Sequence, residues 1–312
     1  MLEYKLNNPN FTIYHRAALG GFAATIQAWG ANQPEGINAK VEQDRVQIDW
    51  NNELTDQEAL RLILAASFKL TEDKLIDLPG QFIGLDTAEL RLAIHEGLCL
   101  TFLQHNKMRP GEKVPRYFPL KIEGEETSEP VTYKAINSYA HQKAQGTGLL
   151  DEVKKGKGER GKFPDIATIP QSVVPGAMSG KKALQAKADE AILLLYLMVG
   201  CVVFLLRPRT YKEKAQACIV VPDVTDLLDF ADSMQSLTIS SQNIQRFSHT
   251  YLGRIVGGAE EAALCFLIDI KADDIAATPG VSGCQVIAMG KVAWDKNQIN
   301  RSISVKMSRN YQ

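Results

Sequence analysis

The chain has 312 residues, of which 45% are hydrophobic and 23% charged. This composition excludes wholesale disorder, and the length fits about two domains. Lys and Arg number 35 against 36 Asp and Glu, and the resulting net charge of -1 argues against histone-like binding of nucleic acid by bulk charge. The five cysteines form no C-x-x-C pair, which disfavours zinc ribbons and thioredoxin chemistry and fits a reducing cytosol.

Helices and short strands follow each other in the first part of the chain. Apolar residues at three- and four-residue spacing predict a helix over 14–29. Alternating apolar residues predict a hairpin of strands at 37–41 and 46–50. Two further strands are expected at 117–122 and 131–135, around an acidic turn.

Two patterns are typical of capping boxes at helix starts. Thr55 is followed three residues later by Glu58, and Asp86 by Glu89, and each pair precedes a run of apolar residues at helical spacing. We therefore expect a helix after Thr55 and another after Asp86.

The composition changes at residue 146, where glycine, proline and lysine become frequent. The sequence predicts an N-terminal α+β domain over 1–145, a Gly/Pro/Lys-rich loop or linker over 146–180, and a C-terminal α+β region over 181–312. In the last region, helices are expected at 182–194, 223–234 (with Asp223 as cap) and 259–267. A strand ending near 207 is expected to pair antiparallel with a strand at 215–221, and strands at 285–294 and 302–307 are expected to form a last hairpin. The predicted fold class is α+β, with mixed helices and short antiparallel sheets.

Local signals of catalysis, cofactors and membranes fail on inspection. Residues 156–161 match G-x-G-x-x-G but lack the preceding strand and following helix that a dinucleotide site needs. The five histidines form neither H-x-x-x-H nor H-E-x-x-H. The most apolar run, 191–206, is short of the ~20 residues that cross a bilayer. The sequence predicts no cofactor, no metal, no catalytic residue and no membrane span.

Basic residues are concentrated in loops. The first cluster contains Lys107, Arg109, Lys113 and Arg116, the second contains Lys154, Lys155, Lys157, Arg160 and Lys162, and the third contains Arg207, Arg209, Lys212 and Lys214. Such loops can approach a nucleic-acid backbone and neutralise its phosphates. A solvated face or a flexible linker is the alternative interpretation.

Several blocks of sequence resemble one known family. They are residues 8–21 (NPNFTIYHRAALGG), 54–60 (LTDQEAL), 75–80 (LIDLPG) and 98–113 (LCLTFLQHNKMRPGEK), with a weaker match at 292–295 (VAWD). These blocks resemble the large subunit of type I CRISPR (Cascade) effector complexes, in the MYXAN-type branch.

The resemblance implies a non-enzymatic, cytoplasmic subunit of an RNA-guided complex. Such a subunit lies near the 5′ end of the guide RNA, recognises the protospacer-adjacent motif on double-stranded DNA and helps to open the duplex. The implied partners are the guide RNA, the target DNA, and the backbone, 5′-handle-binding and small subunits. A role in RNA-guided transposition, with transposition adaptor proteins as partners, stays open.

The basic clusters would then position DNA, and polar side chains would read base edges. The polar residues Asn297, Gln298, Asn300 and Arg301 suit base-edge contact, although the tip of a hairpin explains them equally well.

Large subunits of this kind commonly end in a helical bundle. This chain is expected to end in a strand, so the bundle is expected to be absent or supplied as a separate chain. Two other classes of function stay open: a hydrolase or transferase whose site is assembled only in space, and a scaffold that binds protein alone.

Overall fold

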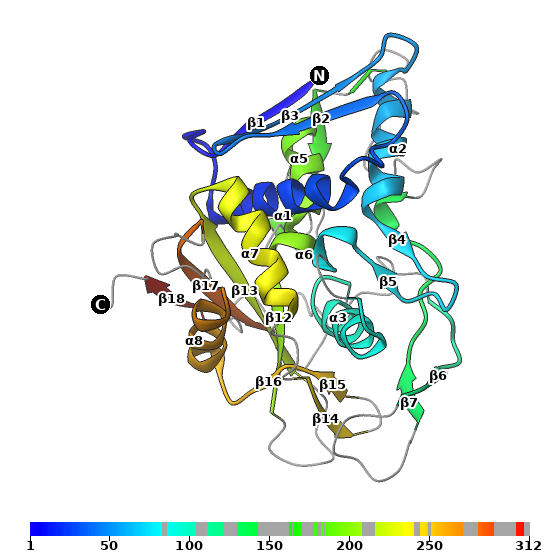
Figure 1. The fold of residues 1–312 in the computed structure, drawn as a ribbon, viewed down its shortest axis with the longest axis vertical. Coiled ribbons are helices and arrows are strands. Elements are labelled where there is room, and N and C mark those ends of the chain that lie inside the picture. The colour runs from blue at the N-terminus through cyan, green and yellow to red at the C-terminus, as the bar shows by residue number, and fades with distance from the viewer. Residues whose placement is uncertain are drawn as a thin grey trace.

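The structure is a computed structural model. It describes residues 1–82, 86–103, 111–120, 130–142, 162–163, 165–169, 178–179, 182–183, 185–207, 216–239, 244–248, 251–270, 280–289 and 304–308. Helices lie against a central five-stranded sheet, and smaller antiparallel sheets surround them (Figure 1). The predicted α+β class is confirmed.

The helices are α1 (Ile13–Trp29), α2 (Asp56–Ser67), α3 (Ala88–Leu100), α5 (Ala188–Leu195), α6 (Leu197–Gly200), α7 (Leu227–Ile239) and α8 (Ala259–Asp269), with 3₁₀ turns at Pro79–Gln81 and Ala140–Gln142. The central sheet has the order β16-β12-β13-β17-β18, formed by Ile255–Val256, Val202–Leu206, Gln216–Val224, Val281–Met289 and Ser304–Ser308. The N-terminal sheet has the order β1-β3-β2, formed by Leu2–Lys5, Arg45–Trp50 and Ile37–Val41.

The remaining strands form two-stranded pairs. They are β4 (Lys69–Leu70) with β5 (Ile76–Asp77), β6 (Arg116–Pro119) with β7 (Pro130–Tyr133), β8 (Ile166–Thr168) with β11 (Gln185–Lys187), β9 (Met178–Ser179) with β10 (Lys182–Ala183), and β14 (Gln245–Ser248) with β15 (Tyr251–Gly253).

Local patterns account for several elements as predicted. Helix α1, the β2–β3 hairpin and helix α8 lie where apolar periodicity places them. At the start of α2, Thr55 accepts a hydrogen bond from the Glu58 N–H, while the Glu58 carboxylate accepts one from the Thr55 N–H, so the predicted capping box is present. The predicted pairing of β12 with β13 and of β17 with β18 is confirmed.

Two predicted helix caps lie elsewhere. Thr87, not Asp86, caps α3 by accepting a hydrogen bond from the Leu90 N–H, and Asp86 instead forms an ion pair with Arg91. Asp226, not Asp223, caps α7, where its carboxylate accepts hydrogen bonds from the N–H groups of residues 228 and 229 at 3.0 Å each. Asp223 lies in β13, because pairing with β17 extends that strand to Val224.

The helix predicted at 182–194 begins later, at Ala188. Residues 185–187 instead form β11, which pairs antiparallel with β8. The spacing of apolar residues favours a helix here, but pairing with β8 gives the backbone of residues 185–187 strand hydrogen bonds instead.

Helix α1 packs against elements that lie far from it along the chain. It packs against α6, α7 and β13, and its residues 20 and 21 are buried glycines. A Cβ atom at Gly21 or Gly200 would overlap backbone atoms of the facing helix, so α1 and α6 touch backbone to backbone. One hydrophobic core consequently contains side chains from before residue 146 and from after residue 180. The division into 1–145, 146–180 and 181–312 stays a prediction.

No helix among the described residues combines the length and the apolar character needed to cross a bilayer.

Candidate nucleic-acid interface

Four of the basic residues singled out in the sequence fall within the described structure. Lys113, Lys162 and Arg207 are exposed, and Arg116 is partly exposed on β6. The other basic and polar candidates lie outside the described residues: Lys107, Arg109, Lys154, Lys155, Lys157, Arg160, Arg209, Lys212, Lys214, Asn297, Gln298, Asn300 and Arg301. Their roles stay predictions. We build the site around Lys113 and Arg116, which belong to one described ribbon.

The β6–β7 ribbon, defined as residues 111–120 and 130–142, carries both of these residues. Its strands pair antiparallel, with Arg116 opposite Tyr133 and Tyr117 opposite Thr132. Since directly opposite residues share a face, the ribbon has two distinct faces. Phe118, Val131 and Tyr133 face a small hydrophobic core, whereas Tyr117 faces away from it.

The inner face holds a charged cluster centred on Glu112. Its carboxylate accepts two hydrogen bonds from the Arg116 guanidinium, at 2.9 and 2.8 Å, and one from the Lys74 ammonium, at 2.9 Å. These two cations lower the pKa of Glu112 to about 2, and the carboxylate raises the pKa of Arg116. Arg116 is therefore held in a bidentate ion pair, and most of its charge is compensated locally.

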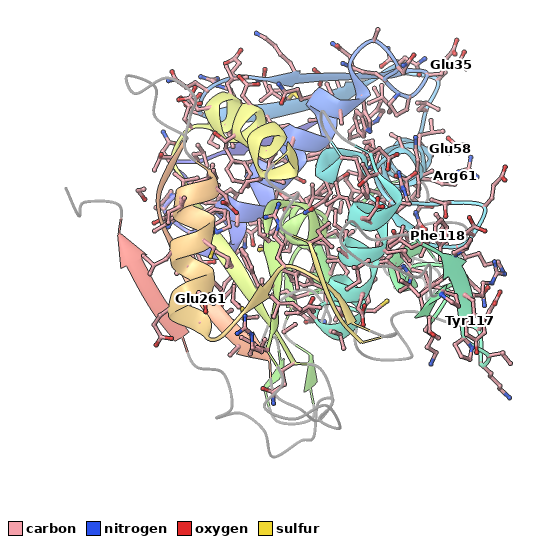
Figure 2. The ribbon with its side chains drawn as sticks, turned by 60° about the horizontal axis from the view of Figure 1, so that its bottom comes forward. Glu35, Glu58, Arg61, Tyr117, Phe118 and Glu261 are labelled. Carbon is pink, nitrogen blue, oxygen red and sulfur yellow. The ribbon has the colours of Figure 1, made fainter. Side chains whose placement is uncertain are left out.

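The outer face is cationic and aromatic. Tyr117 has 66% of its surface exposed, and Val114, just before β6, has 73%. Lys134, one residue beyond β7, is exposed, and the alternation of the strand places it on this face, diagonal to Tyr117. Within the described part of the chain, neither Lys113 nor Lys134 takes part in a salt bridge. Figure 2 shows Tyr117 at the margin of the molecule.

Side chains beneath the ribbon fix its position. The Tyr133 hydroxyl donates to the Asp73 carbonyl at 3.0 Å. His95 on α3 accepts a hydrogen bond at Nδ1 from the Ile76 N–H, at 3.1 Å. Its other nitrogen, Nε2, must then carry the proton, and it donates to the Lys134 carbonyl at 3.0 Å. The ribbon is thus attached to α3 and β5 through a buried imidazole.

This imidazole also bears on the enzymatic alternative. The Cys99 sulfur lies 3.7 Å from His95 Nε2, a pairing that could resemble a nucleophile and its base. Both ring nitrogens, however, are engaged by backbone groups, and the two side chains are buried. They also do not line the cavity of about 60 Å³ between α3, β12 and α7. We assign the pair a structural role.

His141 is buried between aromatic rings and likewise serves packing. Its ring lies 4.5 Å from that of Phe68 and 5.4 Å from that of Tyr139, measured between centroids. Desolvation lowers its pKa to about 3, so it is neutral at physiological pH. The described residues contain no group of three or more His, Cys, Asp or Glu that could bind a metal ion.

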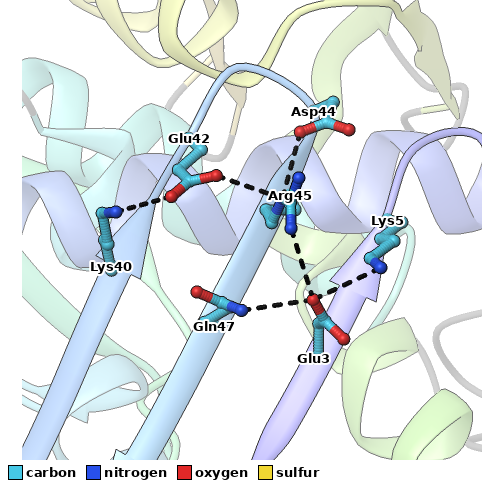
Figure 3. A network of polar contacts seen from close by, with 7 residues as sticks. All are labelled: Glu3, Lys5, Lys40, Glu42, Asp44, Arg45 and Gln47. Carbon is cyan, nitrogen blue, oxygen red and sulfur yellow. Dashed lines mark hydrogen bonds and ion pairs between the residues drawn. The ribbon is translucent and has the colours of Figure 1, made fainter.

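A second charged surface differs from the ribbon in its balance. On the exposed face of the β1-β3-β2 sheet, three cations interlace with three carboxylates (Figure 3). Arg45 contacts Glu42, Asp44 and Glu3 at 3.1, 3.3 and 3.7 Å, while Lys40 contacts Glu42 at 2.5 Å and Lys5 contacts Glu3 at 3.5 Å. Because each cation already has an acidic partner, this face offers a polyanion little net attraction.

Sequence reasoning identified Lys113 and Arg116 but missed Lys134 and Tyr117. Lys134 is an isolated cation in the sequence, and the sequence pattern predicts no more for Tyr117 than a place in a strand. The missing signal is the pairing of β6 with β7, which brings the two onto one face.

Comparison with known proteins agrees with the resemblance in the sequence. The chain is 27% identical over 258 residues to the CRISPR-associated protein Cas8a1/Csx13 of Myxococcus xanthus (strain DK1622). That match covers 76% of this chain and 41% of the relative, so the chain spans about two fifths of the relative's length. The expected relationship to CRISPR large subunits of the MYXAN-type branch is confirmed. The model of the DevT N-terminal domain family matches residues 3–195, which is more than half of the chain, and the chain therefore belongs to the DevT N-terminal domain family.

Proposed function

We propose that this chain is the DNA-reading part of the large subunit of an RNA-guided CRISPR effector complex. Its work would be to recognise a protospacer-adjacent motif and to help open the duplex near the 5′ end of the guide, without catalysis. The observation that carries the proposal is the relationship to the CRISPR-associated protein Cas8a1/Csx13. The cationic β6–β7 ribbon on a chain of net charge -1 gives additional support.

Within this function, the ribbon lysines contact phosphates and hold the duplex in place. Base-edge reading falls to the predicted polar residues Asn297, Gln298, Asn300 and Arg301. The partners are the guide RNA, the target duplex and the other effector subunits in the cytoplasm. Transposition adaptor proteins are further partners if the system serves transposition.

The test is binding of target duplex by the reconstituted, guide-loaded complex. In a variant carrying Lys113→Ala and Lys134→Ala, we expect weaker binding to all duplexes, with or without the motif. Two lost phosphate contacts should reduce the slope of log affinity against log salt concentration by about 2.

The matched control carries Lys5→Ala and Lys40→Ala, two lysines that already pair with Glu3 and Glu42. This control should bind as the unaltered complex does. A second arm replaces the predicted cluster Lys154, Lys155, Lys157, Arg160 and Lys162 with alanine. Unchanged affinity and unchanged salt slope in both arms would contradict the proposal, because neither set of cations would then contact DNA. Turnover of a substrate by the isolated chain would favour a hydrolase or transferase instead.

A further inference from the structure

The outer face of the β6–β7 ribbon carries an aromatic side chain that nothing in the described structure covers. Tyr117 is 66% exposed, and the prolines at 115, 119 and 130 beside it are exposed as well. Three other tyrosines, Tyr4, Tyr133 and Tyr139, are buried, and each donates its hydroxyl to a backbone carbonyl. Tyr117 has no such structural task.

The charge around this ring favours a polyanion. Among the described ribbon residues, Lys113, Arg116 and Lys134 are cations, and Glu112 is the single carboxylate. Glu112 pairs with Arg116 and Lys74, so Lys113 and Lys134 are the charged residues without a salt bridge among the described residues of the ribbon. Lysine is depleted at the centre of protein–protein interfaces, whereas lysine beside an exposed aromatic ring is typical of surfaces that bind single-stranded nucleic acid.

The backbone of the ribbon disfavours a protein strand as the occupant. Pro119 pairs with Pro130 at the end of the ribbon, and Pro115 precedes β6. Proline has no N–H to donate, so these positions block the addition of a further strand along the edge. Contact must then be made by side chains from the outer face.

We propose that Tyr117 stacks on an unpaired base of a single-stranded nucleic acid, while Lys113 and Lys134 neutralise the phosphates beside that base. This inference rests on the proposed function and deepens it, because it adds to the phosphate contacts of the ribbon a contact with the strand that opening of the duplex exposes. A base offers its face for stacking only where it is unpaired or at the end of a duplex.

The experiment uses the full chain and a fluorescein-labelled oligothymidine, with fluorescence anisotropy as the readout. Replacing Tyr117→Ser should weaken binding about tenfold, the effect of losing one aromatic–base stack. Tyr117→Phe should stay within about twofold of the unaltered chain, because stacking needs the ring and not the hydroxyl. The salt dependence should be the same for all three proteins, since no phosphate contact is removed.

Two controls isolate the ring. Leu264→Ser removes another exposed apolar side chain, 50% exposed on α8, and should leave oligothymidine binding unchanged. An abasic oligomer with the same number of phosphates should bind the unaltered chain and the Tyr117→Ser variant equally, because it offers no base to stack.

The proposal is overturned if Tyr117→Ser binds oligothymidine as the unaltered chain does, or if Tyr117→Phe loses as much affinity as Tyr117→Ser. It is also overturned if Tyr117→Ser impairs assembly with the other effector subunits while oligothymidine binding is intact, since the ribbon would then dock protein. Where one of these results overturns stacking and the complex nevertheless loses duplex affinity on replacement of Lys113 and Lys134, the stacking inference fails and the proposed function stands.

Discussion

Glu96 on α3 holds a proton at neutral pH for a reason visible in its surroundings. It is partly buried against β15, where its carboxyl oxygen accepts a hydrogen bond from the Leu252 N–H at 3.1 Å. Desolvation raises its pKa from 4.5 to about 8, and that single hydrogen bond only partly offsets the rise. The folded chain therefore binds a proton that the unfolded chain has released at pH 7.

This raised pKa predicts a pH-dependent stability. For an acid whose pKa is higher in the folded state, the free energy of unfolding is greatest below the unfolded pKa and falls as pH rises through the folded value. Replacing Glu96→Gln keeps an acceptor for the Leu252 N–H and removes the titration. As pH rises from 6 to 8, the unfolding free energy of the unaltered chain should fall relative to that of Glu96→Gln, so the difference between them should grow by roughly 1–2 kcal/mol in favour of the variant.

Urea denaturation at three pH values across this interval measures the difference. Glu260→Gln serves as control, because the Glu260 side chain lies exposed at the start of α8, and this variant should give no pH-dependent difference. A constant offset between Glu96→Gln and the unaltered chain at all pH values would contradict the assignment.

At the scale of an element, the start of α3 shows which residue makes a cap. Thr87 and Asp86 are neighbours, and both residue types are favoured at N-caps. The Thr87 hydroxyl accepts from the Leu90 N–H at 3.2 Å, whereas the Asp86 carboxylate points to Arg91, which also contacts Asp77 at 3.0 Å.

Thr87→Ala should therefore cost about 1 kcal/mol of unfolding free energy, the usual effect of losing a cap. Asp86→Ala should cost less, roughly 0.5 kcal/mol or below, because the Asp86 side chain is 53% exposed and Arg91 keeps its pair with Asp77. Chemical denaturation of both variants gives the order, and the reverse order would identify Asp86 as the effective cap.

The elements that sequence predicted well are those whose cause is local. The capping box of α2 involves residues three apart, and the β2–β3 hairpin joins strands across a short turn. Two of the misplaced features involve distant partners. The Nε of Arg16 binds the Asp223 carboxylate at 2.7 Å from far along the chain, and β11 pairs with β8 across residues 169–184.

The candidate site follows the same division. A local count of cations found Lys113 and Arg116 in one loop. Such a count does not show that Arg116 forms an ion pair with Glu112, because the two hydrogen bonds between them depend on the path of the backbone before β6. Nor could it place Lys134 beside Tyr117, since that requires the register of β6 on β7.

At the scale of the whole molecule, the described fold depends on the crossing of α1 and α6. Gly21 on α1 and Gly200 on α6 leave no room between the two backbones, and a Cβ atom at Gly200 would overlap the Ala17 carbonyl. This crossing brings Phe22 to within 4.0 Å of Tyr196, measured between ring centroids. The tyrosine hydroxyl in turn lies 2.9 Å from the hydroxyl of Ser67 on α2.

Gly200→Ala should accordingly destabilise the protein by about 3 kcal/mol or more, because backbone atoms, unlike a side chain, cannot move aside to relieve the overlap. The matched control is Gly97→Ala in α3, where the new Cβ would lie 3.0 Å from a methyl group of Val203. There, small shifts of one side chain and the better helix propensity of alanine oppose each other, and the net change should stay within about 1 kcal/mol. Thermal denaturation compares the two, and equal midpoints would mean that α1 and α6 are not in backbone contact. Such a result would mean that α1 does not pack in one core with α6 and β13. A large loss of stability for Gly200→Ala alone would show that the fold depends on this crossing.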